Sequence, residues 1–439
     1  MGPFSTLLLA GYQLLFICAG LGYLLLRVIR GRGIPGFRQR CGWYSTGIRR
    51  TLGLMDEPIW IHLVSVGEAM AAEPLLESFR KRFPGKDCVI TTVTPTGQSV
   101  AKRLAKGSRD LLLYLPWDLE GPVHRAIQAI RPSLFIVFET ELWPVLFHRL
   151  RKAQVPIVLV NGRVSPGSYR RYLWVRFLME RVLGCVNCVL TQSPQDARRY
   201  AGMGAAKDRI LVTGNVKWDL DGTNGGVGAH PGDLRTLLGV GPQQILWTAG
   251  STHRGEETLI LRVYERLKRE FPSLRLLLAP RHPERIPEVE QEVRRLALES
   301  IRRSDFNMGS EKSDSDPVIL LDTIGELKAF YEASDVVFVG GSLVPKGGHN
   351  LVEPALFSRP ILTGPSLSNF EAIAESLLAA GGLAMVQSEK ELEERLRLLL
   401  GSPVVRRQLG VKAAGVIEQH RGATERTVEA IAAVLRKNH

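Results

Sequence analysis

Cysteine is scarce in this chain, which has only five among its 439 residues. An odd and sparse set does not suit a framework of disulfides and instead suits a reducing compartment. Two of the five form a Cys185-x-x-Cys188 pair, a spacing found in redox and zinc sites, but no second pair and no nearby histidine accompanies it. The apolar run at residues 185–190 favours a buried strand, so we expect neither redox chemistry nor a metal there.

Nucleic-acid-binding signatures are also missing, because the chain has no RGG tract, no zinc-finger spacing and no basic-aromatic ribonucleoprotein motif. Positive charge is nevertheless in excess, with 57 Lys and Arg against 44 Asp and Glu, a formal net charge of +13. Such a balance favours anionic partners. We therefore expect phosphates or anionic lipid, and no nucleic acid.

Long hydrophobic runs are rare, and the one that stands out covers residues 7–29, about the length that spans a bilayer. No cationic residue precedes it, and five arginines lie at or beyond its end: Arg27, Arg30, Arg32, Arg38 and Arg40. This bias places the body of the protein on the cytoplasmic side. A cleaved signal peptide needs a positive charge in front and a small-residue cleavage site. We therefore expect residues 1–30 to be an uncleaved transmembrane anchor helix, in preference to a signal peptide or an interfacial helix.

Beyond residue 30, short apolar runs alternate with amphipathic stretches, as in a parallel sheet with crossover helices. Six strand-like runs occupy residues 59–64, 87–92, 111–115, 134–138, 156–160 and 188–191, and five more follow at 244–250, 274–279, 318–321, 336–339 and 360–363. We therefore predict an α/β protein with two Rossmann-like domains, at 31–218 and 231–439. The glycine-rich and polar stretch 219–230 is the expected linker, and 303–316 an expected flexible loop.

A glycine-rich segment at residues 340–355 follows one of these strands. Glycines there permit positive φ and leave bare N–H groups, and Asn350 can cap a following helix that has Glu353 in its first turn. A helix N-terminus suits phosphate, whereas Glu353 suits the hydroxyls of a nucleotide sugar. The alternative is a glycine-rich turn with a capped helix and no ligand.

Acidic residues directly after strands are the candidate catalytic groups. Glu68 follows residues 59–64 at a predicted strand-to-helix turn, where a carboxylate can act as a general base or merely favour the helix dipole. Glu139 and Glu141 follow residues 134–138, and burying them unpaired is costly. Arg163, after the strand at 156–160, can clamp a carboxylate or phosphate.

An anchor followed by two Rossmann-like domains and a phosphate-type loop suggests a GT-B glycosyltransferase, in which the two domains face a cleft. The motifs resemble those of the Kdo transferase family, the 3-deoxy-D-manno-octulosonic acid transferases of lipopolysaccharide synthesis. They are residues 62–68 (HLVSVGE), 94–97 (TPTG), 138–144 (FETELWP), 214–219 (GNVKWD), 250–257 (GSTHRGEE), 280–285 (PRHPER) and the glycine-rich segment.

The resemblance implies roles for individual residues. Glu68 corresponds to the family's proton acceptor, while Glu139 and Lys217 correspond to groups that support the transition state. A structural salt bridge is the alternative for Glu139 and Lys217. The implied cytidine monophosphate (CMP) site consists of Pro280, Arg281, Ile324, Gly325, Glu326, Asn350, Leu351, Val352 and Glu353. Further expected substrate contacts are Arg163, Ser251, His253, Gly341 and Gly348.

The resemblance implies an inverting, metal-independent transferase without a cofactor, which moves Kdo from CMP-Kdo to a lipid A precursor, lipid IVA, in lipopolysaccharide core biosynthesis. Its expected place is the inner membrane, single-pass, with the catalytic domains in the cytoplasm. His253, His282 and His349 lie in separate motifs without zinc-ligand spacing, so we expect no metal site. Two alternatives are another membrane GT-B transferase that uses a UDP-sugar, and a membrane-tethered nucleotide-binding protein without turnover.

Overall fold

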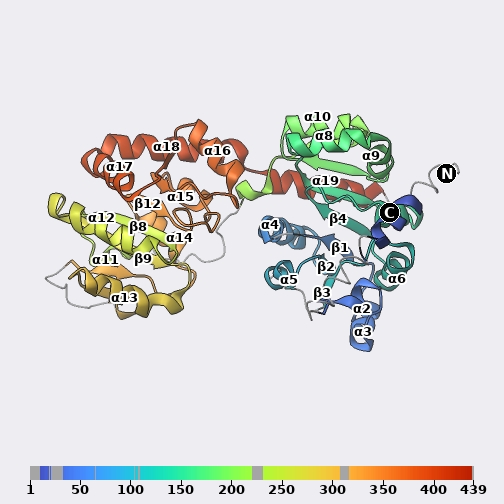
Figure 1. The fold of residues 1–439 in the computed structure, drawn as a ribbon, viewed down its shortest axis with the longest axis horizontal. Helices are drawn as coiled ribbons and strands as arrows, with labels where there is room; N and C mark the ends of the chain where they lie inside the picture. Colours follow the sequence, from blue (N-terminus) through green and yellow to red (C-terminus); the bar gives the residue numbers. More distant parts are fainter. Residues whose placement is uncertain are drawn as a thin grey trace. The chain divides into compact units, whose positions relative to one another are not determined.

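The computed structural model describes residues 10–18, 20, 33–64, 66–102, 104–106, 109–219, 231–306 and 316–437. The chain forms two compact units (Figure 1). Unit 1 consists of Met1–Asp219 together with Gly422–His439, and unit 2 of Leu220–Arg421. The expectation of two α/β domains with parallel sheets is therefore confirmed.

Unit 1 is built on a seven-stranded parallel sheet in the order β3-β2-β1-β4-β5-β6-β7. The strands are β1 (Ile59–His62), β2 (Cys88–Thr92), β3 (Leu111–Tyr114), β4 (Leu134–Phe138), β5 (Ile157–Gly162), β6 (Cys188–Thr191) and β7 (Ile210–Val212). β1 pairs with β2 on one side and β4 on the other, so the chain reverses its direction of travel across the sheet between β1 and β4. In such sheets, ligands bind beyond the carboxyl ends of the strands at this switch point.

Some helices of unit 1 begin at residues whose side chains cap them. Thr94, Ser165 and Ser193 accept backbone hydrogen bonds at the starts of α5, α8 and α10, and each of these helices has proline in its first turn. The elements are α2 (Phe37–Arg40), α3 (Thr46–Leu54), α4 (Val66–Arg82), α5 (Pro95–Ala101), α6 (Glu120–Ile130), α7 (Pro144–Lys152), α8 (Pro166–Trp174), α9 (Arg176–Leu183), α10 (Pro194–Gly202), the 3-10 turns η1 (Lys207–Arg209) and η2 (Val216–Asp219), and α19 (Ala423–Lys437).

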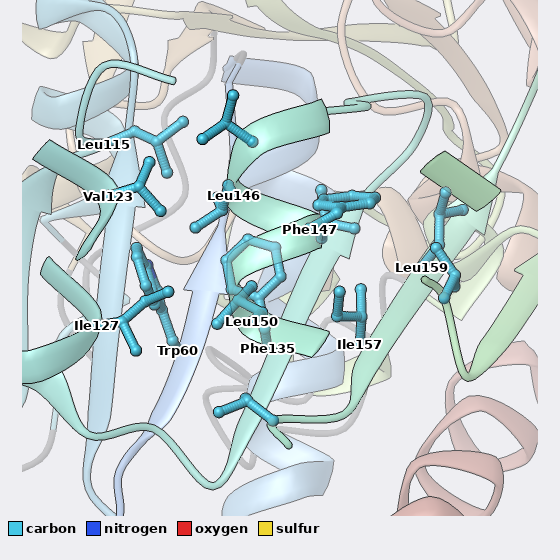
Figure 2. Packing of buried hydrophobic residues seen from close by; sticks show 14 of the residues in the cluster. Trp60, Leu115, Val123, Ile127, Phe135, Leu146, Phe147, Leu150, Ile157 and Leu159 are labelled. Atoms are coloured by element: carbon cyan, nitrogen blue, oxygen red, sulfur yellow. The ribbon is translucent and has the colours of Figure 1, made fainter. Parts of the chain in front are cut away.

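One core cluster of unit 1 lies between the sheet and helices α6 and α7. Figure 2 shows Trp60 and Phe135 from neighbouring strands against Phe147 and Leu150 of α7. Trp60 and Phe135 meet edge to face, with ring centroids 5.1 Å apart. Such pairs add about 1 kcal/mol beyond the area they bury. The packed core thus holds the two strands whose carboxyl ends carry the candidate catalytic acids.

Unit 2 repeats the architecture with the strand order β10-β11-β9-β8-β12-β13-β14, all parallel. Its strands are β8 (Ile245–Thr252), β9 (Leu274–Pro280), β10 (Ser300–Arg302), β11 (Val318–Leu320), β12 (Val336–Val339), β13 (Ile361–Thr363) and β14 (Leu383–Met385). Its helices are α11 (Pro231–Leu237), α12 (Glu256–Glu270), η3 (Pro283–Arg285), α13 (Ile286–Arg295), η4 (Arg303–Asp305), α14 (Leu327–Ala333), α15 (Val352–Leu356), α16 (Glu371–Ala379), α17 (Glu389–Gly401) and α18 (Pro403–His420). Here the switch point lies between β8 and β12.

The end of the chain differs from the expected division, which assigned all of 231–439 to the second domain. α19 instead packs in unit 1, where Val428 and Ile431 are buried in the core cluster beside α4. The Asp219 carboxylate fixes its start by accepting hydrogen bonds from Gly422 N at 2.8 Å and Thr424 N at 2.5 Å. The amphipathic pattern of α19 predicts a helix, but its partner surface is formed by residues far away in the sequence.

Two expected connecting segments have ordered ends. Asp219, the first residue of the expected linker, belongs to η2, and the rest of the linker lies outside the described residues. In the expected loop 303–316, Arg303–Asp305 forms η4, and Asp316 pairs with Lys268 at 2.8 Å and Arg275 at 2.9 Å. Residues 307–315 are not described. Cys188 begins β6, whereas Cys185 lies before it in a turn, so the predicted strand covers only part of 185–190.

Most of the expected anchor lies outside the described residues. Residues 10–18 are helical, and the side chains of Tyr12 and Gln13 contact unit 1: Tyr12 packs against the core, and Gln13 Oε1 accepts from Glu120 N at 3.0 Å. Leu14, Leu15 and Ile17 are exposed. No helix within the described ranges is long and apolar enough to cross a membrane.

Candidate active site

The candidate catalytic carboxylates occupy the switch point of unit 1. Glu68 lies in the first turn of α4, which follows β1, and Glu139 comes directly after β4. Because β1 and β4 are hydrogen-bonded neighbours, with His62 paired to Val137, both acids are placed at the same edge of the sheet. The fold thus brings together two residues that are 71 positions apart in the chain.

Glu68 is almost fully buried, with 4% of its surface exposed. Its Oε2 accepts a hydrogen bond from Val64 N at 2.8 Å, so the carboxylate turns back over the loop that joins β1 to α4. This hydrogen bond fixes the orientation of the side chain at the carboxyl edge of the sheet, as a general base requires.

Glu139 and Lys217 form an ion pair, with Lys217 Nζ 3.2 Å from Glu139 Oε1 and side chains that are 29% and 20% exposed. Glu139 has a φ of 54°, an uncommon conformation for a residue other than glycine. Its carbonyl accepts a hydrogen bond from the Tyr200 hydroxyl at 3.2 Å. Burial, and then the charge of Glu139, raises the pKa of Glu141. The pair is therefore a fixed charged group at the sheet edge.

Asn161 has a positioning role that the sequence motifs did not reveal. It is buried with a φ of 57°, and its Oδ1 accepts from Val216 N at 3.2 Å, which holds the 3-10 turn that carries Lys217. Its Nδ2 has no hydrogen-bond partner among the described residues. The available signal was an Asn-Gly pair at the end of a strand. Arg163, two residues later, accepts from the Thr140 hydroxyl through its carbonyl, and its side chain is exposed.

A cavity of about 330 Å³ lies at the same edge of unit 1. Its lining includes Thr94 and Pro95 of the 94–97 motif, Trp143 of the 138–144 motif, Trp117 and Arg40. Phe16, from the helical residues 10–18, forms part of its wall. The cavity is mostly aromatic and aliphatic with one cationic side chain, a composition suited to a sugar or acyl group that also carries a negative charge.

In unit 2, a buried carboxylate organises the glycine-rich loop after β12. Glu256, the first residue of α12, accepts four backbone hydrogen bonds: from Gly341 N at 2.7 Å, His253 N at 2.9 Å, Ser342 N at 3.0 Å and Leu343 N at 2.9 Å. Burial raises the pKa of Glu256, and these N–H donors oppose that shift. The motif 250–257 contains this residue, but a carboxylate that holds a loop 85 residues later cannot be read from spacing.

Histidines and cations gather beside this loop. His253 Nε2 and His349 Nε2 are 2.9 Å apart, and their rings stack with centroids at 5.2 Å. Burial, followed by the charges of His253, Arg281 and His282, lowers the pKa of His349 to about 4. The pKa of His253 is also lowered, first by burial and then by the charges of His282 and Lys346. Both rings are therefore neutral at pH 7, and the positive charge comes from Arg281 and Lys346.

The glycines of this loop leave no room for a side chain. Gly341 has a φ of 67°, and a Cβ placed on it would lie 2.8 Å from His349 Cδ2. Gly348 has a φ of 72°, and its N–H donates to Gly341 O at 2.8 Å. Ser251, at the end of β8, also has a positive φ of 56°. The positive φ expected of these glycines thus occurs at Gly341 and Gly348.

The other expected CMP-binding segments lie at the same sheet edge. Pro280 ends β9, and Arg281 follows it, with its N–H donating to Thr252 O at 2.9 Å. Ile324 is 88% exposed, and Gly325 has a φ of 93°. Glu326 accepts from Arg303 Nη2 at 3.0 Å and from the Thr323 hydroxyl.

The segment at residues 350–353 is ordered by its own side chains. Asn350 Oδ1 accepts from Val352 N at 2.9 Å, and its Nδ2 donates to Glu353 Oε1 at 3.1 Å. Leu351 and Val352 are fully buried, so neither residue contributes open surface to the expected site. Burial raises the pKa of Glu353, opposed by Asn350 and by Lys328 of α14. Lys328 lies two residues after Glu326 on α14, which packs against α15, so the two segments are neighbours.

Among the described residues, no group of three or more His, Cys, Asp and Glu side chains is arranged to hold a metal ion. His253, His282 and His349 do lie close together, but the nearest nitrogens of His253 and His349 face each other as a hydrogen-bonded pair. The cluster is thus a polar wall beside Arg281.

Comparison with known proteins gives consistent matches. A family model described as 3-deoxy-D-manno-octulosonic-acid transferase (kdotransferase) matches residues 35–220. The 3-deoxy-D-manno-octulosonic acid transferase of Haemophilus influenzae is 36% identical over 431 residues, covering 97% of this chain and 98% of that protein. The enzyme of the same name from Bordetella pertussis is 32% identical and covers 85% and 86%.

Among solved structures, a putative UDP-N-acetylglucosamine 2-epimerase from Listeria monocytogenes is similar in fold. Its TM-score is 0.53 at 14% identity, over 88% of this chain and 98% of that one. This likeness concerns the two-domain α/β fold alone.

Proposed function

Because the chain belongs to the 3-deoxy-D-manno-octulosonic acid (Kdo) transferase family and is thus a glycosyltransferase of lipopolysaccharide synthesis, we propose that it transfers Kdo from CMP-Kdo to a lipid A precursor, lipid IVA. The observation that carries the proposal is the placement of Glu68 and of the Glu139–Lys217 pair at the carboxyl edge of one sheet, at its switch point.

In this mechanism, an acceptor hydroxyl oxygen attacks the anomeric carbon of Kdo. The new carbon–oxygen bond forms as the bond to the CMP phosphate oxygen breaks, and CMP leaves with that electron pair. Glu68 takes the proton of the hydroxyl. Attack from the face opposite the leaving group inverts the anomeric centre. A positioned base of this kind contributes about 10²–10⁴-fold to the rate.

The Glu139–Lys217 pair has a separate task in this mechanism. Lys217 offsets the negative charge of the donor, and Glu139 favours the positive charge that develops at the sugar carbon. The pair is held by Asn161 through η2 and by Tyr200 through the Glu139 carbonyl. A fixed pair of this kind needs little reorganisation when charge develops, which supports a role in transition-state stabilisation.

CMP is the proposed occupant of unit 2. Arg281 and Lys346 suit its phosphate, whereas the N–H groups of Gly341, Ser342 and Leu343 already donate to Glu256. The Glu353 carboxylate suits the ribose hydroxyls. Neutral His253 and His349 add hydrogen-bonding groups without repelling Arg281. We assign Ser251, Gly341, Gly348 and the exposed Ile324 to the same site, and we keep Arg163 as a proposed substrate contact of unit 1.

The acceptor and the membrane belong to the same proposal. The cavity lined by Arg40 and Trp143 suits a phosphorylated glycolipid. Exposed Arg38, Arg49 and Arg50 follow the apolar segment closely, and cations at such positions favour an anionic cytoplasmic leaflet. We therefore place the enzyme at the inner membrane, attached by its N-terminal segment, with both units on the cytoplasmic side.

Product analysis tests the proposal directly. The purified full-length protein is incubated with a tetraacylated, bisphosphorylated lipid A precursor and either CMP-Kdo or a panel of UDP-sugars. The masses of the lipid products are then measured by mass spectrometry. A mass increase of one or more Kdo units with CMP-Kdo alone is the expected result. Transfer from a UDP-sugar, or nucleotide binding without product, would replace the proposal by one of its alternatives.

A further inference from the structure

The corner between α8 and α9 exposes large apolar side chains that the proposed chemistry does not use. Trp174 is 89% exposed, Phe177 49%, Leu173 38% and Val175 37%. We call residues 173–177, with their flanking arginines, the α8–α9 corner. Single exposed apolar residues are ordinary, but four in five consecutive positions form a contiguous patch, which on a soluble surface marks an interaction site.

The charges around the corner have one predominant sign. Arg170, Arg171 and Arg176 are exposed, and no ion pair involves them within the described ranges. Glu180 is the nearest acid in the sequence, four residues beyond Arg176. Uncompensated arginines beside tryptophan and leucine complement a surface that is anionic outside and apolar beneath.

The corner is held firmly from below. α9 buries Met179, Val182 and Leu183 in the core of unit 1, and the rings of Tyr169 and Tyr172 on α8 pack against that core. α8 itself has no fully buried residue. Because the inner face of the pair is fixed, the outward position of Trp174 and Phe177 is a property of the folded unit, on the side where Figure 1 labels α8, α9 and α10.

We infer that the α8–α9 corner inserts into the interface of an anionic bilayer, with Leu173, Trp174 and Phe177 at the level of the headgroups and upper acyl chains and with Arg170, Arg171 and Arg176 on lipid phosphates. Tryptophan favours this region because its ring is apolar and its indole N–H is polar. Arginine reaches phosphate from beside it, since its stem is apolar and its end is charged.

This inference rests on the proposed function and deepens it, because it names the surface that brings the catalytic edge to a lipid acceptor. The link is the start of α8. This helix follows β5, the neighbour of β4, and the Thr140 hydroxyl donates to Arg163 O, so α8 begins beside the loop that carries Glu139. Insertion of the corner into the bilayer therefore determines the distance between the lipid surface and the sheet edge that carries the candidate catalytic residues.

Fluorescence quenching tests the insertion without relying on activity. Full-length protein is reconstituted in vesicles that contain phosphatidylglycerol and lipids brominated near the top of their acyl chains. We expect quenching to fall clearly in Trp174→Phe. Trp247→Phe is the control, since Trp247 is buried in the core of unit 2. Equal quenching of wild type and Trp174→Phe, or a fall no larger than that of Trp247→Phe, would overturn the inference.

Charge reversal tests the arginines. In Arg170→Glu/Arg171→Glu/Arg176→Glu, the ratio of inserted to free Trp174 should fall by more than about tenfold in anionic vesicles, since each arginine near such a surface is worth roughly fivefold. The control triple, Arg294→Glu/Arg395→Glu/Arg407→Glu, changes the same charge on exposed arginines of unit 2 and should leave the ratio unchanged. An unchanged ratio in the first triple contradicts membrane insertion. So does sedimentation that shows self-association of the wild type while Trp174 is not quenched, because the corner would then be buried between copies of the protein.

Activity separates this inference from the proposed function. Leu173→Ser/Trp174→Ser/Phe177→Ser should lower transfer to an acceptor embedded in vesicles by about tenfold or more and leave transfer to a short-chain, dispersed acceptor within about twofold. Absence of product with wild type under both conditions would refute the proposed function instead. Equal rates of the variant and wild type on the embedded acceptor would refute the role of the corner alone.

Discussion

The Glu68 carboxylate is the group whose replacement should separate binding from turnover. Glu68→Gln keeps the shape of the side chain and can still accept from Val64 N, but it cannot take a proton. We expect transfer to fall on the order of 10²–10⁴-fold, with CMP affinity unchanged, as measured by single-turnover kinetics and calorimetry. Glu73→Gln, on the same helix, is the control. Turnover near the wild-type rate in Glu68→Gln would show that Glu68 is not the general base.

Lys217 and Glu139 admit two interpretations, a structural salt bridge or a catalytic pair, and one variant distinguishes them. The pair is partly exposed, so its loss should change the free energy of unfolding by no more than about 1 kcal/mol. If Lys217 offsets donor charge, Lys217→Ala should lower transfer by about 100-fold or more while Tm changes by only a few degrees. A large drop in Tm with a preserved rate per folded molecule would support the structural interpretation.

His62 gives a pH dependence that can be assigned to one ring. It is fully buried, its Nδ1 lies 3.1 Å from Thr91 O, and burial lowers its pKa to about 3. Above pH 6.5 the ring is neutral in the folded and unfolded states, so its contribution to stability is complete. Between pH 6.5 and 3 only the unfolded chain binds the proton, so stability falls as pH falls, by up to about 1.4 kcal/mol per pH unit.

Chemical denaturation of wild type and His62→Asn at pH 7.0 and 5.0 measures this contribution. We expect the wild type to lose about 2 kcal/mol more than the variant over that interval. His124→Asn is the control, because His124 is exposed. Equal losses in wild type and His62→Asn would show that His62 takes up its proton in the folded state.

At the scale of single residues, the sequence motifs identified Glu68, Glu139, Lys217 and Arg281 as candidates but not the residues that position them. Glu68 and Glu139 were recognisable because each follows a β-rich apolar run. Asn161 and Glu256 act through buried hydrogen bonds to segments 55 and 85 or more residues away, and no local pattern encodes such a partner. The His253–His349 contact likewise joins two motifs through the fold.

The conformation of the glycine-rich loop after β12 depends on α12, because Glu256, the first residue of that helix, accepts hydrogen bonds from the backbone N–H groups of the loop. Each oxygen of Glu256 accepts two of the four hydrogen bonds, so Glu256→Gln, which replaces one oxygen by an NH₂ group, leaves two N–H donors without their partner. Charged hydrogen bonds of this kind are worth about 1.5–3 kcal/mol each. We expect CMP binding to weaken by about tenfold or more.

Calorimetry with CMP measures that change, and hydrogen exchange at residues 341–343 should rise with it. Glu257→Gln is the matched control, because Glu257 is also buried on α12 but pairs with Arg285 at 2.7 Å. Exchange rates at 341–343 that do not change in Glu256→Gln would mean that the loop keeps its shape without the carboxylate.

Elements were predictable where apolar runs were long enough. Residues 134–138, 188–191 and 336–339 are strands with the predicted bounds. β7, β10 and β14 escaped prediction because each has three residues and lies at or next to a sheet edge, where burial is incomplete and the apolar pattern is short. A three-residue strand is set by its neighbour in the sheet rather than by its own sequence.

For the whole molecule, the N-terminal segment does more than the tether that its sequence predicts. Tyr12 packs on the core of unit 1, and Phe16 lines the cavity beside Trp143. We expect Phe16→Ala to raise KM for the glycolipid acceptor several-fold, since it removes part of a cavity wall, and to leave KM for CMP-Kdo unchanged. Leu15→Ala, on the exposed face, is the control. Equal effects on both substrates would mean that the segment acts on the fold and not on the acceptor.

The return of α19 to unit 1 has a consequence for synthesis in the cell. The ribosome releases Leu220–Arg421 before Ala423–Lys437, and at roughly 5–20 residues per second that interval lasts about 10–40 s. During this time the groove that Val428, Ile431 and Leu435 fill stays open to water and to other nascent chains. The first unit therefore cannot finish folding before the second has been made, so a chaperone that shields apolar grooves should matter more for this protein than for one whose domains are contiguous in the gene.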